Sequence, residues 1–204
     1  MKPKKPITEW KNIFLDTSFI IDYFTYGKSD IKDQLTKERR ELVNSVMEIL
    51  SNYDLEGGNQ KRNFYISSLS VTELRKLEKD NVAKELVRIF SASDVTFVDY
   101  TKNIALVLNR SLETHLPEGQ KHQFLSYLEK ELKYSNVVSA RQWVTMDLMI
   151  AGSAKSVKNL DVVLTSDKKT FKLIADTLDL PCLAMFKEEI DFDLFGEISI
   201  AKSK

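Results

Sequence analysis

Short apolar segments alternate with longer amphipathic segments along the chain, and this alternation constrains the fold more than any other feature. The amphipathic segments, such as residues 40–50 and 104–112, place apolar side chains at helical spacing. The short segments are rich in β-branched and aromatic residues, as strands are. They cover residues 13–15, 64–67, 95–98, 162–165 and 182–186. Strands that alternate with helices predict an α/β fold built on one sheet.

The length of the chain and the lack of internal boundaries predict a single domain over residues 1–204. With 204 residues and 43% hydrophobic content, the chain can bury one full core. It shows no repeat and no linker rich in Pro, Gly or Ser. Residues 111–144 are predicted to form a helical insertion, because a Pro-Glu-Gly break at 117–119 precedes the amphipathic run "HQFLSYLEKELKY". We expect its apolar face to pack on the body of the domain, with a homodimer or a partner's helix as the next alternatives.

Several classes of protein are disfavoured by composition. No run of 18 apolar residues exists, and no apolar segment follows the basic start "MKPKK", so we expect no membrane span and no signal peptide. Cys182 is the single cysteine, which fits a reducing cytoplasm. Thirty basic residues balance thirty acidic ones, so any nucleic acid must be bound through local basic patches.

Acidic residues stand where the predicted strands end. Asp16 directly follows the first strand, and Asp167 follows the fourth. Glu73 is expected in the first turn of the helix after the second strand, and Asp147 is expected to open the helix "TMDLMIAGSAKS". Because ligands of an open parallel sheet bind outside the carboxyl ends of its strands, the four acids are predicted to converge there.

Each acid also has a structural explanation. Ser70 and Glu73 have the spacing of a capping box, Thr165 and Ser166 are typical helix-starting residues, and the helix dipole favours any acid in a first turn. Asp16 is harder to explain in this way, because it has no basic partner nearby in the sequence. Carboxylates that converge repel one another unless a cation is present. Metal binding is therefore the simplest explanation that keeps all four ionised.

The donor atoms indicate which metal and which chemistry. Oxygen-only ligands favour Mg²⁺ or Mn²⁺ over zinc, and the two histidines and one cysteine show no zinc spacing. A carboxylate site with one or two such ions suits displacement at a phosphodiester, because the metal activates a water and stabilises the leaving oxygen. The pattern therefore favours a nuclease.

Four segments, in order, resemble the motifs of PIN-domain ribonucleases, the family of the VapC-type toxins: "FLDTSFIIDYF", "SSLSVTEL", "TMDLMIAGSA" and "VVLTSDKKTF". The resemblance implies a three-layer α/β/α sandwich with a central parallel sheet and a Mg²⁺- or Mn²⁺-dependent endoribonuclease. RNA is the implied substrate, and an antitoxin protein is the partner of a toxin of this kind. The implied catalytic metal ligands are Asp16, Glu73, Asp147 and Asp167.

Further residues are assigned supporting roles. Thr17 and Thr165 occupy hydroxyl positions beside the first and last acids of such motifs, which implies that they orient a carboxylate or water. Lys168 and Lys169 directly follow a proposed ligand, so we expect them to contact the substrate.

Two other functions stay open. A haloacid-dehalogenase-like phosphatase would use Asp16 as its nucleophile, but it normally needs a second Asp two residues later, where this chain has Ser18. A non-catalytic PIN-like module would bind RNA or protein, and a broken acidic site would favour it. Metal-dependent cleavage of a single-stranded RNA discriminates among the three.

Overall fold

The computed structural model describes residues 1–26, 33–52, 61–74, 95–115 and 137–190. Within these residues a five-stranded sheet has the order β3-β2-β1-β4-β5, and every neighbouring pair of strands is parallel. Its strands are β1 (Asn12–Leu15), β2 (Asn63–Ser67), β3 (Val95–Val98), β4 (Val162–Thr165) and β5 (Cys182–Ala184). The predicted α/β class and parallel sheet are confirmed.

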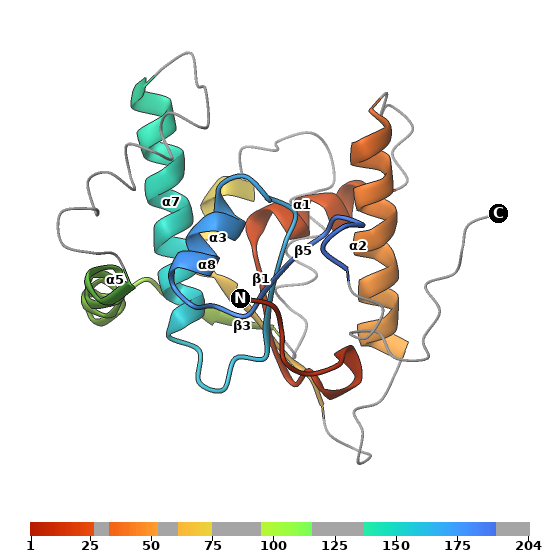
Figure 1. Cartoon of the computed structure of the whole chain (residues 1–204), viewed down its shortest axis with the longest axis horizontal. Helices are drawn as coiled ribbons and strands as arrows, with labels where there is room; N and C mark the ends of the chain where they lie inside the picture. Colours follow the sequence, from red (N-terminus) through yellow and green to blue (C-terminus); the bar gives the residue numbers. More distant parts are fainter. Residues whose placement is uncertain (27–32, 53–60, 75–94, 116–136, 191–204) are drawn as a thin grey trace.

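Helices cover both faces of this sheet (Figure 1). On one face lie α1 (Thr17–Thr25) and α2 (Gln34–Asn52). On the other face lie α5 (Lys102–His115), α7 (Val137–Lys155) and α8 (Phe171–Thr177). The short α3 (Ser68–Leu74) starts directly where β2 ends and packs against α1 and α7. A single-turn 3-10 helix, η1 (Ile7–Glu9), precedes the sheet.

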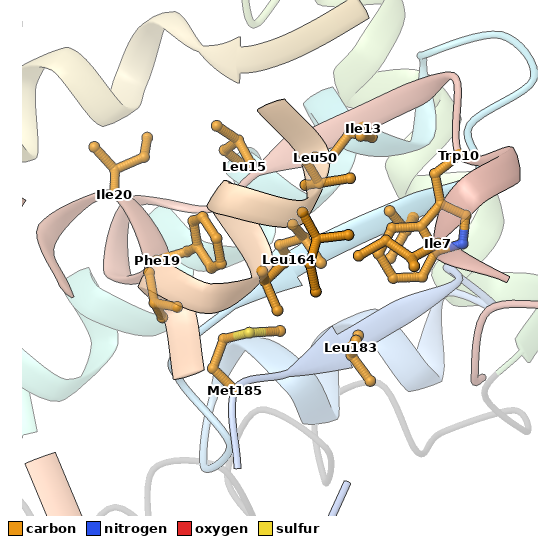
Figure 2. Packing of buried hydrophobic residues seen from close by; sticks show 14 of the residues in the cluster. Ile7, Trp10, Ile13, Leu15, Phe19, Ile20, Leu50, Leu164, Leu183 and Met185 are labelled. Carbon is orange, nitrogen blue, oxygen red and sulfur yellow. The ribbon is translucent and has the colours of Figure 1, made fainter. Parts of the chain in front are cut away.

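Two hydrophobic cores form because side chains of a strand point alternately to opposite faces. Leu15 belongs to the core under α1 and α2, together with Phe19 and Leu50. Figure 2 shows this core, with Ile7 and Trp10 at the end that lies away from Phe19 and Ile20. Phe14 belongs to the other core, under α5, α7 and α8. The chain therefore forms the three layers that the motif resemblance implies.

The strand order creates a reversal point between β1 and β4. The chain runs outward from β1 through β2 to β3, and then returns to place β4 and β5 on the other side of β1. In open α/β sheets, ligands bind outside the carboxyl ends of the strands at such a point.

The predicted elements mostly agree with the observed ones. All five predicted strands are present, although the last ends at Ala184 because Phe186 N turns back to donate to the Ala184 carbonyl at 2.8 Å. The helix predicted over 40–50 begins earlier, at Gln34. Its first turns are mostly polar, so apolar periodicity does not reveal them. Of the predicted insertion 111–144, residues 111–115 continue α5 and residues 137–144 belong to α7, while 116–136 lie outside the described residues.

No helix among the described residues combines the length and apolar character needed to cross a membrane.

Candidate active site

Two of the four predicted acids flank the reversal point of the sheet. Asp16 directly follows β1 and caps the start of α1, and Asp167 lies two residues after β4. Because β1 and β4 are neighbouring parallel strands, both acids lie at the same carboxyl edge. The predicted placement of Asp16 and Asp167 is confirmed.

The other two acids approach the same edge from helices, but not from first turns as predicted. Glu73 is nearly buried in the second turn of α3, because this helix already begins at Ser68. The capping-box interpretation is also wrong, since Ser70 lies inside α3 rather than before it. Asp147 lies in the middle of α7, because the residues before "TMD" continue the helix back to Val137.

Asp16 is 3% exposed, and its carboxylate is held on one side only. Oδ2 accepts a hydrogen bond from the Thr165 hydroxyl at 2.8 Å, another from the Ser18 hydroxyl and a third from Ser18 N at 3.3 Å. Oδ1 accepts no hydrogen bond from the residues that the structure describes. One oxygen of Asp16 is therefore positioned by hydroxyls, while the other is available to a ligand.

Burial raises the pKa of Asp16 from its usual 3.8 to about 7. The neighbouring carboxylates of Asp167 and Glu73 contribute to this rise, whereas the hydrogen bonds from Ser18 and Thr165 oppose it. Charge on Asp16 is therefore costly near neutral pH unless a cation compensates it.

Asp147 is half-buried, and no described residue pairs with its charge. Within the described part of the chain, its carboxylate forms no hydrogen bond and no ion pair. Burial raises the pKa of Asp147 well above its usual value, and the carboxylates of Asp16, Asp167 and Glu73 raise it further. These electrostatic effects indicate that the four acids lie close enough to repel one another.

Asp167 has a structural role in addition to its charge. Its Oδ1 accepts hydrogen bonds from the backbone N–H groups of Lys169 and Thr170 at 2.8 and 2.9 Å, and its Oδ2 accepts one from Phe171 N at 3.3 Å. Asp167 thus holds the turn that leads into α8, whose N-cap residue is Thr170, whereas the sequence suggested Thr165 and Ser166 as the helix-starting residues. Both oxygens of Asp167 are engaged, unlike those of Asp147.

The hydroxyl groups differ in what they support. Thr165 orients Asp16, as its position in the motif implied. Thr17 does not contact the Asp16 carboxylate, because its hydroxyl donates to Ser70 Oγ at 2.8 Å and so joins α1 to α3. Ser18 was not predicted, yet it bonds Asp16 and accepts from Ser166 N at 2.9 Å. The spacing of Asp16 and Ser18, an acid two residues before a hydroxyl at a helix start, is the signal that could have identified it.

The two predicted substrate-binding lysines border the acids. Lys168 and Lys169 are both exposed. Lys168 Nζ lies 2.6 Å from Glu188 Oε1, and Lys169 contributes its backbone N–H to Asp167. The basic charge beside Asp167 is therefore present at the surface.

The donor set at this edge matches a hard divalent cation in kind. It consists of carboxylates, and the oxygens of Asp147 together with Oδ1 of Asp16 are not engaged by the described residues. However, no three His, Cys, Asp or Glu side chains of the described residues are grouped closely enough to hold a metal ion. The acids therefore interact through space without forming a complete coordination shell.

Comparison with known proteins gives little guidance. No family model and no curated protein sequence matches this chain. Among solved structures, the chain is similar to one in the crystal structure of VapBC2 from Rickettsia felis bound to a DNA fragment from their promoter. The two are 18% identical, the match covers 85% of this chain and 98% of that one, and the TM-score is 0.43. A likeness this distant assigns neither an activity nor a partner.

Proposed function

We propose that this protein is a Mg²⁺- or Mn²⁺-dependent endoribonuclease that hydrolyses RNA phosphodiester bonds at the carboxyl edge between β1 and β4. The observation that carries the proposal is the uncompensated acidic pair. Asp16 is buried and Asp147 is half-buried, and neither forms an ion pair with a Lys or Arg of the described residues. A divalent cation would balance this charge and let both carboxylates ionise at neutral pH.

Asp16 and Asp147 would hold the cation, which when bound would lower the pKa of the attacking water and stabilise the leaving oxygen. Asp16 would offer Oδ1, because Thr165 and Ser18 hold its other oxygen in place. Asp147 would break no hydrogen bond or ion pair on binding the cation, since its carboxylate has none among the described residues. Asp167 would add negative charge while keeping the loop that carries Lys168 and Lys169 in place.

The choice of RNA as substrate rests on the four ordered segments that resemble PIN-domain ribonucleases. The exposed Lys168 and Lys169 beside Asp167 support it, because a phosphodiester needs positive charge next to an acidic centre. The same resemblance supports a toxin role with an antitoxin protein as partner. The nuclease proposal does not depend on that role.

The experiment is a cleavage assay with a labelled single-stranded RNA in Mg²⁺, Mn²⁺ or EDTA. Wild type is expected to cut in either metal and to stop in EDTA, while Asp147→Asn is expected to be inactive. Asp179→Asn is the matched control: Asp179 lies before β5, at the opposite edge of the sheet, and its positive φ of 52° suits Asn. Cleavage that persists in EDTA or in Asp147→Asn would refute the proposal.

Two further measurements test the alternatives, which are a phosphatase that uses Asp16 and a non-catalytic binding module. A phosphatase that uses Asp16 would trap a covalent phosphate when given a small aryl phosphate. A binding module would retain RNA without cleaving it in any metal.

A further inference from the structure

An aromatic residue lies beside the acidic edge, one strand away from Asp167. In the register of β4 and β5, Thr165 pairs with Ala184. Asp167 lies two residues after Thr165, and Phe186 lies two residues after Ala184. Two backbone hydrogen bonds fix the turn that holds Phe186, one from its own N–H to Ala184 O and one from Glu189 N to Phe186 O. The ring is therefore held at the same carboxyl edge as the acids.

Two cations lie over the Phe186 ring. Lys168 Nζ is 5.5 Å from the ring centroid, and the guanidinium carbon of Arg39 is 5.9 Å from it. Arg39 is fixed in place, because its Nε and Nη2 both donate to the buried Asp22. Lys168 is held from the solvent side, where its side chain is 40% exposed and pairs with Glu188. We name Arg39, Phe186 and Lys168 the cation–aromatic cluster.

We propose that the cation–aromatic cluster binds an unpaired nucleotide of single-stranded RNA next to the scissile bond, with Lys168 moving from the Phe186 ring to the phosphate and the base stacking on the ring face that Lys168 covered. The position of this subsite rests on the function proposed above. The chemistry rests on the cluster itself: aromatic rings stack bases with little sequence preference, and interleaved cations hold the backbone. A base inside a duplex cannot reach the ring, so the cluster selects unpaired RNA.

Glu188 is the residue that a phosphate would have to replace. Its carboxylate lies 2.6 Å from Lys168 Nζ and is 62% exposed. An ion pair this exposed is weak and exchanges readily. Lys187 in the same turn pairs with Glu38 of α2 at 2.9 Å. Glu188 therefore acts as a competitor of the RNA phosphate at Lys168.

The test is fluorescence anisotropy with a short labelled single-stranded RNA in EDTA, so that binding is measured without cleavage. Phe186→Leu should weaken binding roughly 5- to 20-fold. Lys168→Met should weaken it and lower the slope of log K against log salt by about 0.7. Glu188→Gln should tighten it about 2- to 5-fold, as an exposed ion pair allows. The same strand in a duplex should bind weakly, and Phe186→Leu should not change that binding.

Matched controls exclude general effects of the substitutions. Phe97 is partly exposed on β3, the opposite edge strand, so Phe97→Leu should leave binding unchanged. Lys158 is exposed before the amino end of β4, so Lys158→Met should leave the salt slope unchanged. Thermal melts of all five variants show that each is folded at the assay temperature.

The outcomes separate this inference from the proposed function. If wild type cuts RNA with metal but Phe186→Leu and Lys168→Met bind like wild type, the subsite is wrong and the nuclease stands. If both variants lose binding as expected but no RNA is cut, the subsite stands and the nuclease is wrong. Equal binding of duplex and single strand, or single-stranded DNA bound far more tightly than RNA, would overturn the assigned ligand.

Discussion

The hydroxyl of Thr165 donates a 2.8 Å hydrogen bond to Oδ2 of Asp16, and so joins the carboxyl ends of β4 and β1. The same Thr165 oxygen accepts a hydrogen bond from Asp167 N at 3.0 Å. Thr165 is fully buried, so no water can replace it in either contact. One side chain thus positions two acids of the candidate site.

Thr165→Val keeps the shape of this side chain and removes its hydroxyl. We expect it to cost about 1–3 kcal/mol of unfolding free energy, because Asp167 N and Asp16 both lose a buried partner. RNA cleavage should fall more than tenfold, since Asp16 is no longer oriented. Urea denaturation at pH 8 and the cleavage assay measure the two effects. Thr114→Val, at an exposed helix position, is the control; equal results for the two variants would count against the role of Thr165.

The pKa of Asp16 makes the stability of the metal-free protein depend on pH. The folded value is about 7 and the ordinary value is 3.8, so the folded state binds the Asp16 proton more tightly than the unfolded state. The contribution of Asp16 to the free energy of unfolding should therefore be highest below pH 4. It should fall as the pH rises to about 7. The fall is on the order of 4 kcal/mol, since one pKa unit corresponds to about 1.4 kcal/mol.

Asp16→Asn mimics the protonated form and should lack this fall. Urea denaturation of both proteins between pH 4 and 8 in EDTA tests it, because the difference between the two profiles isolates Asp16 from other groups. Parallel profiles would show that Asp16 is not perturbed in the folded protein.

Asp147→Asn should stabilise the metal-free protein at pH 8, because it removes one of four mutually repelling carboxylates. A gain of about 1 kcal/mol raises Tm by about 2–4 °C for a chain of this size. Mg²⁺ should raise the Tm of wild type by mass action but not that of the variant. The Asp179→Asn control should respond to Mg²⁺ like wild type. A metal-free Asp147→Asn that melts below wild type would indicate that Asp147 is a structural residue.

Asp22 stabilises the fold without belonging to the site. Its buried carboxylate accepts from Arg39 and, at 3.3 Å, from Arg40 Nε, which joins α1 to α2. Asp22→Asn should cost about 2–4 kcal/mol, below the range for fully buried pairs because both arginines are partly exposed. The exposed Glu113→Gln should change stability by less than about 0.5 kcal/mol. Denaturation in urea compares them, and a small effect of Asp22→Asn would contradict the pairing.

The sequence predicts the sheet well because the strands are short, apolar and bounded by polar residues. Val163 and its neighbours in β4 are fully buried, and only a strand covered on both faces tolerates such a run. The positions of Asp16 and Asp167 are predictable for the same reason, because each lies just after the end of such a strand. The helix starts were predicted less well, because Asp147 resembles a first-turn acid although α7 begins at Val137.

Contacts between distant segments could not be predicted from one sequence. Asp22 lies in an apolar run and gives no local sign of Arg39, its partner from the next helix. Thr17 and Ser18 are equivalent as hydroxyls beside Asp16, and only the packing of α3 against α1 decides that Thr17 bonds Ser70 while Ser18 bonds the acid. Such choices are made by tertiary packing rather than by local sequence.

Anomalous diffraction from a crystal grown in Mn²⁺ tests the proposed metal site without requiring activity, because it locates the ion and its ligands. We predict an anomalous peak at the carboxyl edge between β1 and β4, from an ion coordinated by Asp16 and Asp147. Asp147→Asn crystals should lose this peak under the same conditions. An edge with no peak at saturating Mn²⁺, or with a Lys or Arg side chain paired to Asp16, would contradict the proposed metal site.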